Sequence, residues 1–191
     1  MRALLVTAFA LLSPSIASAD IQDAMFGADP TPDDAAPAVR SRGYLAAGTM
    51  AGVDDIFRFG GTLEGGVRIG DSPLFVHGLV GAGAGGGIYD EGTYLQLRAG
   101  VEARTCTRTA LLCGFAGADL ALTSDSITRD ADYDHAMHRT TQRFGVVPRI
   151  GGELGRTIKL RASIEAPIYA PTVMDDATVG LAFNLGLGYA F

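Results

Sequence analysis

The 191-residue sequence has no excess of basic residues: 15 Lys and Arg stand against 21 Asp and Glu, a formal net charge of −6. A nucleic-acid-binding domain normally presents a basic face, so this charge balance argues against that class. Charged residues of both signs make up only 19% of the chain and hydrophobic residues 48%, which excludes a disordered chain. The length fits one domain with a substantial core.

The sequence also lacks long hydrophobic runs beyond its N-terminal segment. No later stretch approaches the roughly 18 consecutive apolar residues that a membrane-spanning helix needs, which excludes helical membrane proteins. Barrels cross membranes with a different, alternating pattern, so this absence does not exclude them. Glycine, in contrast, is abundant, because 26 of 191 residues is about twice the usual share of roughly 7%. No collagen-type period accompanies it, so glycine serves turns or close packing.

A short apolar segment opens the chain. Arg2 precedes an apolar run at residues 3–12, and Ala-Ser-Ala at residues 17–19 supplies a cleavage site of the A-x-A type. A positive start, a short apolar middle and small residues at the end are typical of a secretory signal peptide. We therefore predict a signal peptide at residues 1–19 and an exported chain.

The segment that follows has a different composition. No cysteine stands at Asp20 to carry a lipid, which argues against a lipoprotein. Residues 20–39 contain five aspartates, three prolines and no basic residue. Such a segment buries little apolar surface, so we predict an acidic, Pro-containing flexible tail there and a folded domain at residues 40–191.

From residue 43 onward, apolar and polar residues alternate. In residues 57–69, for example, Phe57 and Phe59 share one face, while Arg58 and Glu64 lie on the other. This period of two is typical of a strand whose two faces meet different surroundings. We predict eight strands, at residues 43–53, 57–69, 74–84, 93–104, 113–124, 143–154, 158–166 and 179–191.

The lengths of these segments favour a membrane barrel. Most exceed the five or six residues typical of strands in soluble sandwiches, and they match the roughly 9–11 residues with which a tilted strand crosses a bilayer. Short turns at one rim and longer loops at the other are typical of membrane barrels, and the predicted links alternate in this way. They are tight turns at 71–73 and 155–157, a short link at 53–56, and longer loops at 85–92, 125–141 and 170–178.

The end of the sequence resembles the last strand of Gram-negative outer-membrane proteins. Its alternating apolar residues are Phe183, Leu185, Leu187, Tyr189 and Phe191. In that family such a strand is the signal that the barrel-assembly machinery recognises. Residues 43–191 as a whole resemble the small eight-stranded barrels that include the transmembrane domain of outer-membrane protein A. Pro148 and Pro167 depart from that pattern, because each removes a ladder hydrogen bond, and we expect bulges or early strand ends there.

The resemblance implies an all-β, eight-stranded antiparallel up-and-down barrel in the outer membrane, surrounded by outer-membrane lipid. A lysine or arginine facing lipid at mid-depth costs about 2–4 kcal/mol, so the charged face of each strand must line the lumen. The predicted lumen residues are Arg58, Glu64, Arg68, Arg98, Glu102, Arg104, Asp119, Arg143, Arg149, Glu153, Lys159, Arg161 and Glu165. Because side chains just fill an eight-stranded barrel, we expect bidentate arginine–carboxylate pairs that plug it. The alternative is a narrow, porin-like pore, which the excess of three positive charges would make anion-preferring.

The chain has only two cysteines, Cys106 and Cys113, on either side of the link between the fourth and fifth predicted strands. In an exported chain, such a pair predicts a disulfide across the hairpin. Counting strands from a periplasmic N-terminus puts this link at the periplasmic rim. Two free thiols, or half of a metal site, are the alternatives.

Two other patterns in the sequence are weaker indications of a binding or catalytic site. Residues 81–86 match the glycine spacing of a dinucleotide loop, but no helix follows to bind phosphate. The longest predicted loop contains carboxylates and imidazoles that could bind a metal, or serve a lipid-modifying enzyme together with Ser124 or Ser126. These residues are Asp130, Asp132, Asp134, His135 and His138. No spacing completes a site, so we predict no catalytic, metal or cofactor site.

The sequence therefore predicts a structural or interaction barrel that presents loops to the exterior, with an unknown loop partner. The alternatives are a narrow anion-preferring pore and a lipid-modifying outer-membrane enzyme. A soluble lipocalin-like barrel is the rival fold, and it requires apolar residues inside and polar residues outside.

Overall fold

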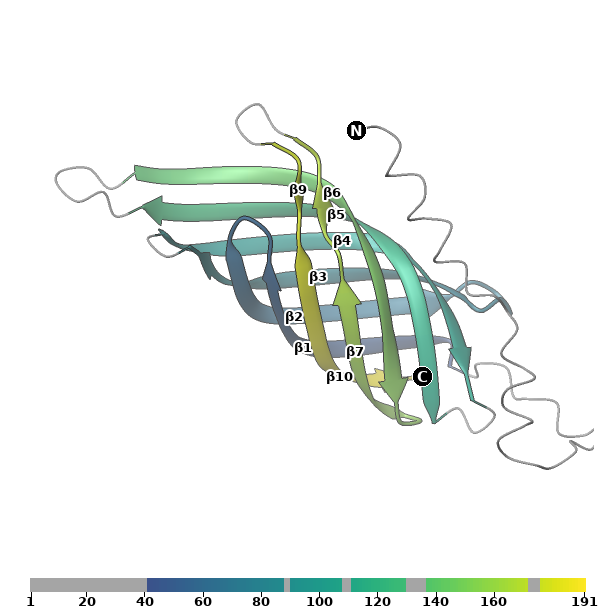
Figure 1. Ribbon diagram of the computed structural model, residues 1–191. Helices are drawn as coiled ribbons and strands as arrows, with labels where there is room; N and C mark the ends of the chain where they lie inside the picture. Colours follow the sequence, from purple (N-terminus) through teal and green to yellow (C-terminus); the bar gives the residue numbers. More distant parts are fainter. Residues whose placement is uncertain (1–40, 88–89, 108–110, 130–136, 172–175) are drawn as a thin grey trace, which may run out of the picture. The chain divides into compact units, whose positions relative to one another are not determined.

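A computed structural model describes residues 41–87, 90–107, 111–129, 137–171 and 176–191 (Figure 1). The predicted signal peptide at 1–19 and the acidic tail at 20–39 lie outside the described residues. Within the described part, no helix is long and apolar enough to cross a membrane.

The described chain forms one closed antiparallel sheet. Its strands are β1 (Gly43–Val53), β2 (Phe57–Arg68), β3 (Leu74–Gly86), β4 (Asp90–Cys106), β5 (Leu112–Arg129), β6 (Met137–Leu154), β7 (Ile158–Glu165), β8 (Ile168–Tyr169), β9 (Thr178–Val179) and β10 (Leu181–Ala190). Strands β1 to β6 each pair with the next strand in the chain, β10 pairs with β7, and the short β8 pairs with β6 and β9. Strand β1 pairs with β10 from Tyr44↔Ala190 to Val53↔Leu181, which closes the sheet. Since β7 continues into β8 and β9 into β10, the barrel has eight strands, which confirms the predicted fold class.

Proline causes the split between β7 and β8. Pro167 has no N–H to donate to the next strand, although its carbonyl accepts a hydrogen bond of 2.8 Å from the Gly180 N–H. Pro148 stays inside β6, where its carbonyl accepts from the Ala166 N–H at 3.0 Å. The pairs Arg149↔Glu165 and Val146↔Ile168 keep one register across this region. Pro167 therefore ends a strand as expected, whereas neither proline introduces a bulge.

Strands β4, β5 and β6 are longer than predicted, at 17, 18 and 18 residues. Much of the predicted loops at 85–92 and 125–141 is strand, so those two boundaries were wrong. Alternation of apolar and polar residues stops at Leu95, Leu122 and Phe144, but pairing continues from Tyr94↔Asp125 to Asp90↔Arg129. Serine and threonine dominate the outward positions there, and they need no apolar surroundings. We call these polar ends of β4, β5 and β6 the β4–β6 extension; in Figure 1 it projects beyond the β1–β2 hairpin.

The outer surface of the barrel is apolar and its interior is polar. Phe59, Leu97, Leu120 and Ile164 are each 46–56% exposed although they lie in the middle of strands. Most of the predicted lumen residues are, by contrast, almost completely buried. The lipocalin-like alternative is therefore wrong, and the apolar exterior fits hydrocarbon rather than water.

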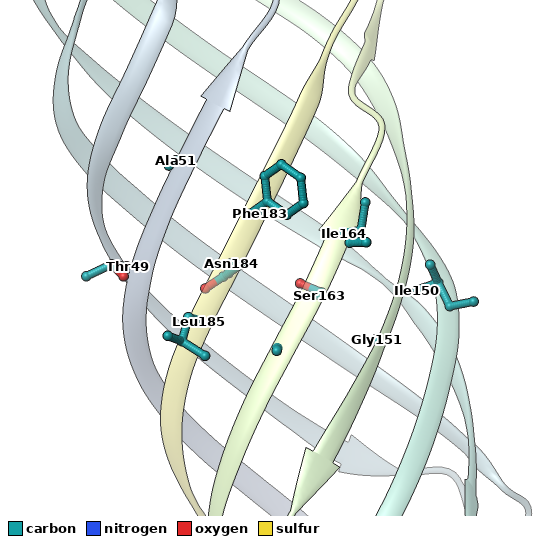
Figure 2. Close-up of a pocket in the computed structure, with 10 residues that line it drawn as sticks. Thr49, Ala51, Ile150, Gly151, Ser163, Ile164, Phe183, Asn184 and Leu185 are labelled. Atoms are coloured by element: carbon teal, nitrogen blue, oxygen red, sulfur yellow. The ribbon is translucent and has the colours of Figure 1, made fainter.

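A hollow of about 610 Å³ lies in this outer wall, over β1, β6, β7 and β10. Phe183, Ile164 and Ile150 project around it, and the short side chain of Ala51 leaves room beside them (Figure 2). Apolar side chains of the lipid-facing belt dominate its lining. Its hydroxyl groups belong to Thr49 and Ser163, and the Ser163 hydroxyl donates to Glu165 at 2.9 Å.

Part of the glycine content is explained by aromatic rings inside the lumen. The ring of Tyr44 lies against Gly66, and the ring of Phe115 lies against Gly151. A Cβ at either glycine would overlap the ring, so only glycine permits this contact. Glycine thus makes room in the narrow interior for large rings, on which arginine side chains stack.

We expect Leu185→Arg to destabilise the barrel by about 2–4 kcal/mol, because Leu185 lies on the lipid-facing side in the middle of β10. Leu111→Arg is the matched control, since Leu111 is similarly exposed but lies in a link at the rim. The free energy of unfolding in lipid vesicles, obtained from urea titrations, measures both. Equal effects of the two substitutions would contradict a hydrocarbon-facing position for Leu185.

Candidate functional site

The two rims of the barrel differ. The terminal rim carries the first described residues, Phe191, the links at 69–73 and 155–157, and the ends of β4 and β5 at Cys106 and Leu112. The loop rim, at the opposite end, carries the link at 54–56 and the strand ends at Gly86, Asp90, Arg129, Met137, Tyr169 and Thr178. The candidate site is the charged lumen between these rims.

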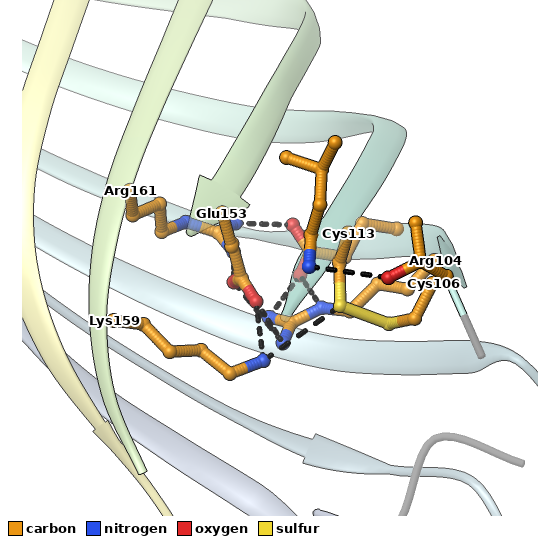
Figure 3. Close-up of a disulfide and its surroundings, with 9 residues drawn as sticks. Arg104, Cys106, Cys113, Glu153, Lys159 and Arg161 are labelled. Atoms are coloured by element: carbon orange, nitrogen blue, oxygen red, sulfur yellow. Dashed lines mark hydrogen bonds and ion pairs between the residues drawn. A yellow bond between two sulfur atoms is a disulfide. The ribbon is translucent and has the colours of Figure 1, made fainter. Parts of the chain in front are cut away.

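The predicted disulfide closes the β4–β5 hairpin at the terminal rim. Cys106 and Cys113 are register partners, and their sulfurs are bonded (Figure 3). Cys113 is only 2% exposed, because its side chain points into the lumen. There its Sγ lies 4.0 Å from Lys159 Nζ, which donates a hydrogen bond of 2.8 Å to Glu153. The disulfide is thus joined to the charged lumen rather than isolated at the surface.

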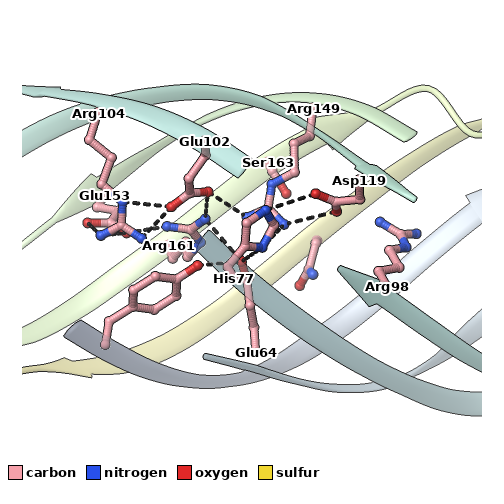
Figure 4. Close-up of polar contacts among 12 residues, drawn as sticks. Glu64, His77, Arg98, Glu102, Arg104, Asp119, Arg149, Glu153, Arg161 and Ser163 are labelled. Atoms are coloured by element: carbon pink, nitrogen blue, oxygen red, sulfur yellow. Dashed lines mark hydrogen bonds and ion pairs between the residues drawn. The ribbon is translucent and has the colours of Figure 1, made fainter. Parts of the chain in front are cut away.

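A large ionic cluster fills the lumen above the disulfide (Figure 4). We call it the basal cluster, and it consists of Glu64, His77, Glu102, Arg104, Asp119, Arg149, Glu153, Lys159 and Arg161. Its members come from six strands, β2 to β7, and none is more than 6% exposed. Residues far apart in the sequence therefore meet across the barrel.

Shared carboxylates hold the basal cluster together. Arg161 Nη2 donates to Glu102 Oε2 at 2.5 Å and to Glu64 Oε1 at 3.1 Å. Arg149 Nη2 contacts the same two oxygens, at 3.1 Å from Glu102 and 2.5 Å from Glu64. Arg161 also pairs with Glu153, and Arg104 with Glu102. These guanidiniums bridge several carboxylates at once, so the expected bidentate pairs are absent among these contacts.

Aromatic rings cover the faces of the guanidiniums whose edges bind carboxylates. Arg161 Cζ lies 3.8 Å from the centroid of the Phe115 ring. Arg104 Cζ lies 4.0 Å from the Tyr44 ring and 4.1 Å from the Phe75 ring. A planar guanidinium can stack and bind carboxylates simultaneously, which a lysine ammonium cannot do. This explains why arginine dominates the lumen.

The middle of the lumen is mostly neutral. Arg98 pairs with Glu165, which also accepts a hydrogen bond of 2.9 Å from Ser163. Above this pair, Gln96 donates to the hydroxyl of Tyr169 at 3.1 Å. Apart from the Arg98–Glu165 pair, these side chains are uncharged and are joined by hydrogen bonds.

A second ionic cluster lies in the lumen near the loop rim. We call it the mouth cluster, and it consists of Asp54, Asp55, Arg58, Asp125 and Arg143. Arg58 binds Asp125 in bidentate fashion, with Nε–Oδ1 at 3.0 Å and Nη2–Oδ2 at 2.9 Å, and also pairs with Asp54. Arg143 binds both oxygens of Asp55, with Nη1–Oδ1 at 2.7 Å. Here the predicted bidentate arginine–carboxylate geometry is present.

The two aspartates of the β1–β2 link have opposite pKa shifts. Burial raises the pKa of Asp54 above its ordinary value, and a hydrogen bond with Asp55 adds to this. Burial alone would also raise the pKa of Asp55, but the hydrogen bonds from Arg143 outweigh it and lower that pKa far below its ordinary value. The Asp55–Arg143 pair is therefore ionised at any physiological pH.

The mouth cluster changes the charge balance of the lumen. The buried cations are Arg58, Arg98, Arg104, Arg143, Arg149, Lys159 and Arg161, and the buried carboxylates on strands are Glu64, Glu102, Asp119, Asp125, Glu153 and Glu165. Asp54 and Asp55 add two carboxylates. With these aspartates the carboxylates balance the cations, so the described lumen lacks the predicted excess of positive charge. The sequence analysis did not assign Asp54, Asp55 or Asp125 to the lumen.

Other predicted site residues lie outside these clusters. Arg68 is at the terminal rim, where its Nη2 lies 3.5 Å from Asp71 Oδ1. The five residues of the predicted C-terminal signal line the lipid-facing side of the last strand and are 51–63% exposed. The proposed loop ligands Asp130, Asp132, Asp134 and His135, and the side chain of His138, lie outside the described residues. Gly81 to Gly86 belong to strand β3.

One group of side chains has the spacing of a metal site. Ligand atoms of Glu64, His77 and Glu102 lie within 4.8 Å of one another. Arg149 and Arg161 already bind both carboxylates, at 2.5–3.1 Å. A metal ion would have to displace two guanidiniums from a fully buried cluster, so these residues do not fit a resident metal.

Comparison with known proteins supports the fold. No protein-family model and no curated protein matches the sequence. Among solved structures, the chain is similar to Neisserial surface protein A, with a TM-score of 0.61 and 14% identity over 79% of this chain and 98% of that one. It is also similar to OprG of Pseudomonas aeruginosa, with a TM-score of 0.56 and 10% identity over 79% of this chain and 96% of that one. A third similar structure is Ail, the attachment invasion locus protein of Yersinia pestis, with a TM-score of 0.52 and 13% identity over 79% of this chain and 99% of that one. These likenesses show the fold of small outer-membrane barrels, and they agree with the predicted outer-membrane location.

We expect Glu102→Gln to lower the free energy of unfolding by about 3–5 kcal/mol, because it leaves three buried guanidiniums without their shared carboxylate. Urea titration in lipid vesicles measures this loss. The control is Asp71→Asn at the terminal rim, where the carboxylate is fully exposed and its loss leaves the unfolding midpoint unchanged. An unchanged midpoint for Glu102→Gln would refute the central role of its carboxylate.

Replacing both cysteines by serine removes a short covalent loop, since Cys106 and Cys113 are separated by seven positions. In the chain-entropy view such a loop contributes about 2 kcal/mol, so we expect a loss of that size in the same titration. Reduction of the native protein with a dithiol provides the matched measurement and is expected to give the same loss. No change in either experiment would contradict a stabilising disulfide.

Proposed function

We propose that this chain is a non-enzymatic structural or interaction barrel of the outer membrane, closed to ions and presenting the β4–β6 extension to the exterior. The observation that carries the proposal is closure at two levels. The basal cluster and the mouth cluster each cross the lumen with multiple buried ion pairs. A permeating ion would have to break both, and breaking one buried pair costs about 3–5 kcal/mol.

The β4–β6 extension supports the interaction role. Beyond Leu122, the remainder of β5 is roughly 20 Å long at about 3.3 Å per residue. Its outward side chains are Ser124, Ser126 and Thr128, which suit water rather than lipid. The extension therefore offers a rigid hydroxyl-rich sheet surface above the membrane, and its partner is unknown. The name of the structurally similar protein Ail refers to attachment and invasion.

The orientation and assembly of the barrel follow from the same proposal. The terminal rim, with its short turns, faces the periplasm, where oxidation maintains the disulfide. The aromatic and aliphatic face of β10, ending at Phe191, is the signal for the barrel-assembly machinery.

The pore and enzyme alternatives have less support. An anion-preferring pore needs an excess of cations that the described lumen lacks. A lipid-modifying enzyme needs a nucleophile and a base in contact. Ser124 and Ser126 lie on the outward side of β5, whereas His77 lies in the lumen, buried between Glu64 and Asp119.

The proposal predicts that the purified protein, reconstituted in a planar bilayer, gives no steady single-channel current. A shift in gel mobility on boiling in detergent shows in parallel that the sample is a folded barrel. A steady, anion-selective current from folded protein would overturn the closed-barrel proposal in favour of the pore.

A further inference from the structure

The link between β1 and β2 closes over the lumen at the loop rim. It contains Asp54, Asp55 and Ile56, and we call it the cap. Ile56 is only 8% exposed and the Asp54 side chain 1%, which is unusual for residues of a three-residue link. The cap is folded internally as well, since the Ile56 N–H donates to Asp54 Oδ1 at 3.0 Å.

Ion pairs hold the cap to the opposite side of the barrel. Asp55 binds Arg143 of β6, and Asp54 binds Arg58, which in turn binds Asp125 of β5. Without these pairs, only the apolar contacts of Ile56 would hold the cap against the barrel. Charge therefore dominates the contacts that keep it closed.

The cap differs physically from the basal cluster. Every member of the basal cluster is carried by a strand, so displacing it breaks ladder hydrogen bonds on both sides. The cap lies beyond the last β1–β2 pair, Val53↔Phe57, and its movement breaks none of them. In addition, the Asp55 side chain is 37% exposed, so water and ions compete directly for Arg143.

Below the cap, the lumen is occupied by polar but mostly uncharged side chains. Gln96, Thr123 and Tyr169 hydrogen-bond one another there, and the Arg98–Glu165 pair lies beneath them. We propose that the cap is a movable lid over this polar layer, held shut by the Asp55–Arg143 and Asp54–Arg58 pairs. Opening exposes the two arginines and the polar layer to the exterior while the basal cluster keeps the lumen closed. This inference rests on the proposed function, because a lid over a conducting pore would be a channel gate instead.

Cysteine labelling tests the lid directly. Both native cysteines are in the disulfide, so an introduced cysteine is the only free thiol. We expect Ile56→Cys to react with a membrane-impermeant maleimide about tenfold or more slowly than Ala177→Cys, which is exposed at the same rim. Adding Arg143→Gln to Ile56→Cys is expected to raise its rate about tenfold, the effect of losing one bidentate pair.

Matched variants identify the cause. Asp55→Asn removes the other partner of the Asp55–Arg143 pair and should raise the labelling rate of Ile56→Cys equally. It replaces Arg143→Gln in the test if that variant does not fold. Arg156→Gln, an exposed arginine at the terminal rim, should leave the rate unchanged. The boiling-dependent gel shift reports folding of each variant.

The outcomes separate the two proposals. Equal labelling of Ile56→Cys and Ala177→Cys in the otherwise native chain overturns the lid, as does a rate unaffected by Arg143→Gln and Asp55→Asn. Each of these results leaves the closed barrel standing. A steady bilayer current from the native protein overturns the closed barrel, whatever the labelling rates are.

Discussion

The high cost of exposing polar groups to hydrocarbon governs this structure. A backbone in lipid must satisfy every N–H and C=O internally, so the sheet has to close, and β1 pairs with β10 along its full length. The same cost drives charged side chains from the outer wall into the lumen. There they can remain only if each is neutralised by a partner, because a lone buried charge is even less favourable. Apolar exterior, closed sheet and ionic interior are thus consequences of one constraint.

The narrowness of the lumen then decides how the charges are neutralised. With room for few side chains per level, Glu64 and Glu102 each serve two or more arginines, and aromatic rings cover the guanidinium faces. Glycine beneath these rings provides the space, as Gly66 does for Tyr44. Such sharing couples side chains from six strands. We infer that a substitution in the basal cluster is felt across the barrel rather than at one contact.

Alternation in the sequence predicted the eight strands, and the cost of charge in lipid predicted which side of them faces inward. The resemblance of residues 43–191 to small outer-membrane barrels implied that the sheet closes, and β1 does pair with β10. Alternation did not predict the ends of β4, β5 and β6, because it depends on an apolar outward face. Beyond Leu122 and Phe144 the outward side chains of the strands are polar, so no apolar face marks these segments, and their pairing depends on neighbouring strands. Asp54 and Asp55 resemble ordinary turn residues in the sequence. Only the closed barrel brings them to Arg58 and Arg143, so their burial is a tertiary effect. Asp125 was missed because it lies beyond Leu122, where the alternation in β5 stops, and so fell in the predicted loop at 125–141.

The pairing of β1 with β10 also has a kinetic consequence. Tyr44 and Ala190 are partners although nearly the whole barrel lies between them in the sequence. Neighbouring hairpins can form as soon as each is available, but this last seam must wait for all of them. Until it forms, β1 and β10 each expose an unpaired edge, and the strands that carry the lumen ion pairs do not yet enclose an interior. Loop-closure entropy is greatest for this contact, so joining the seam is expected to be the slow step that commits the chain to its folded state.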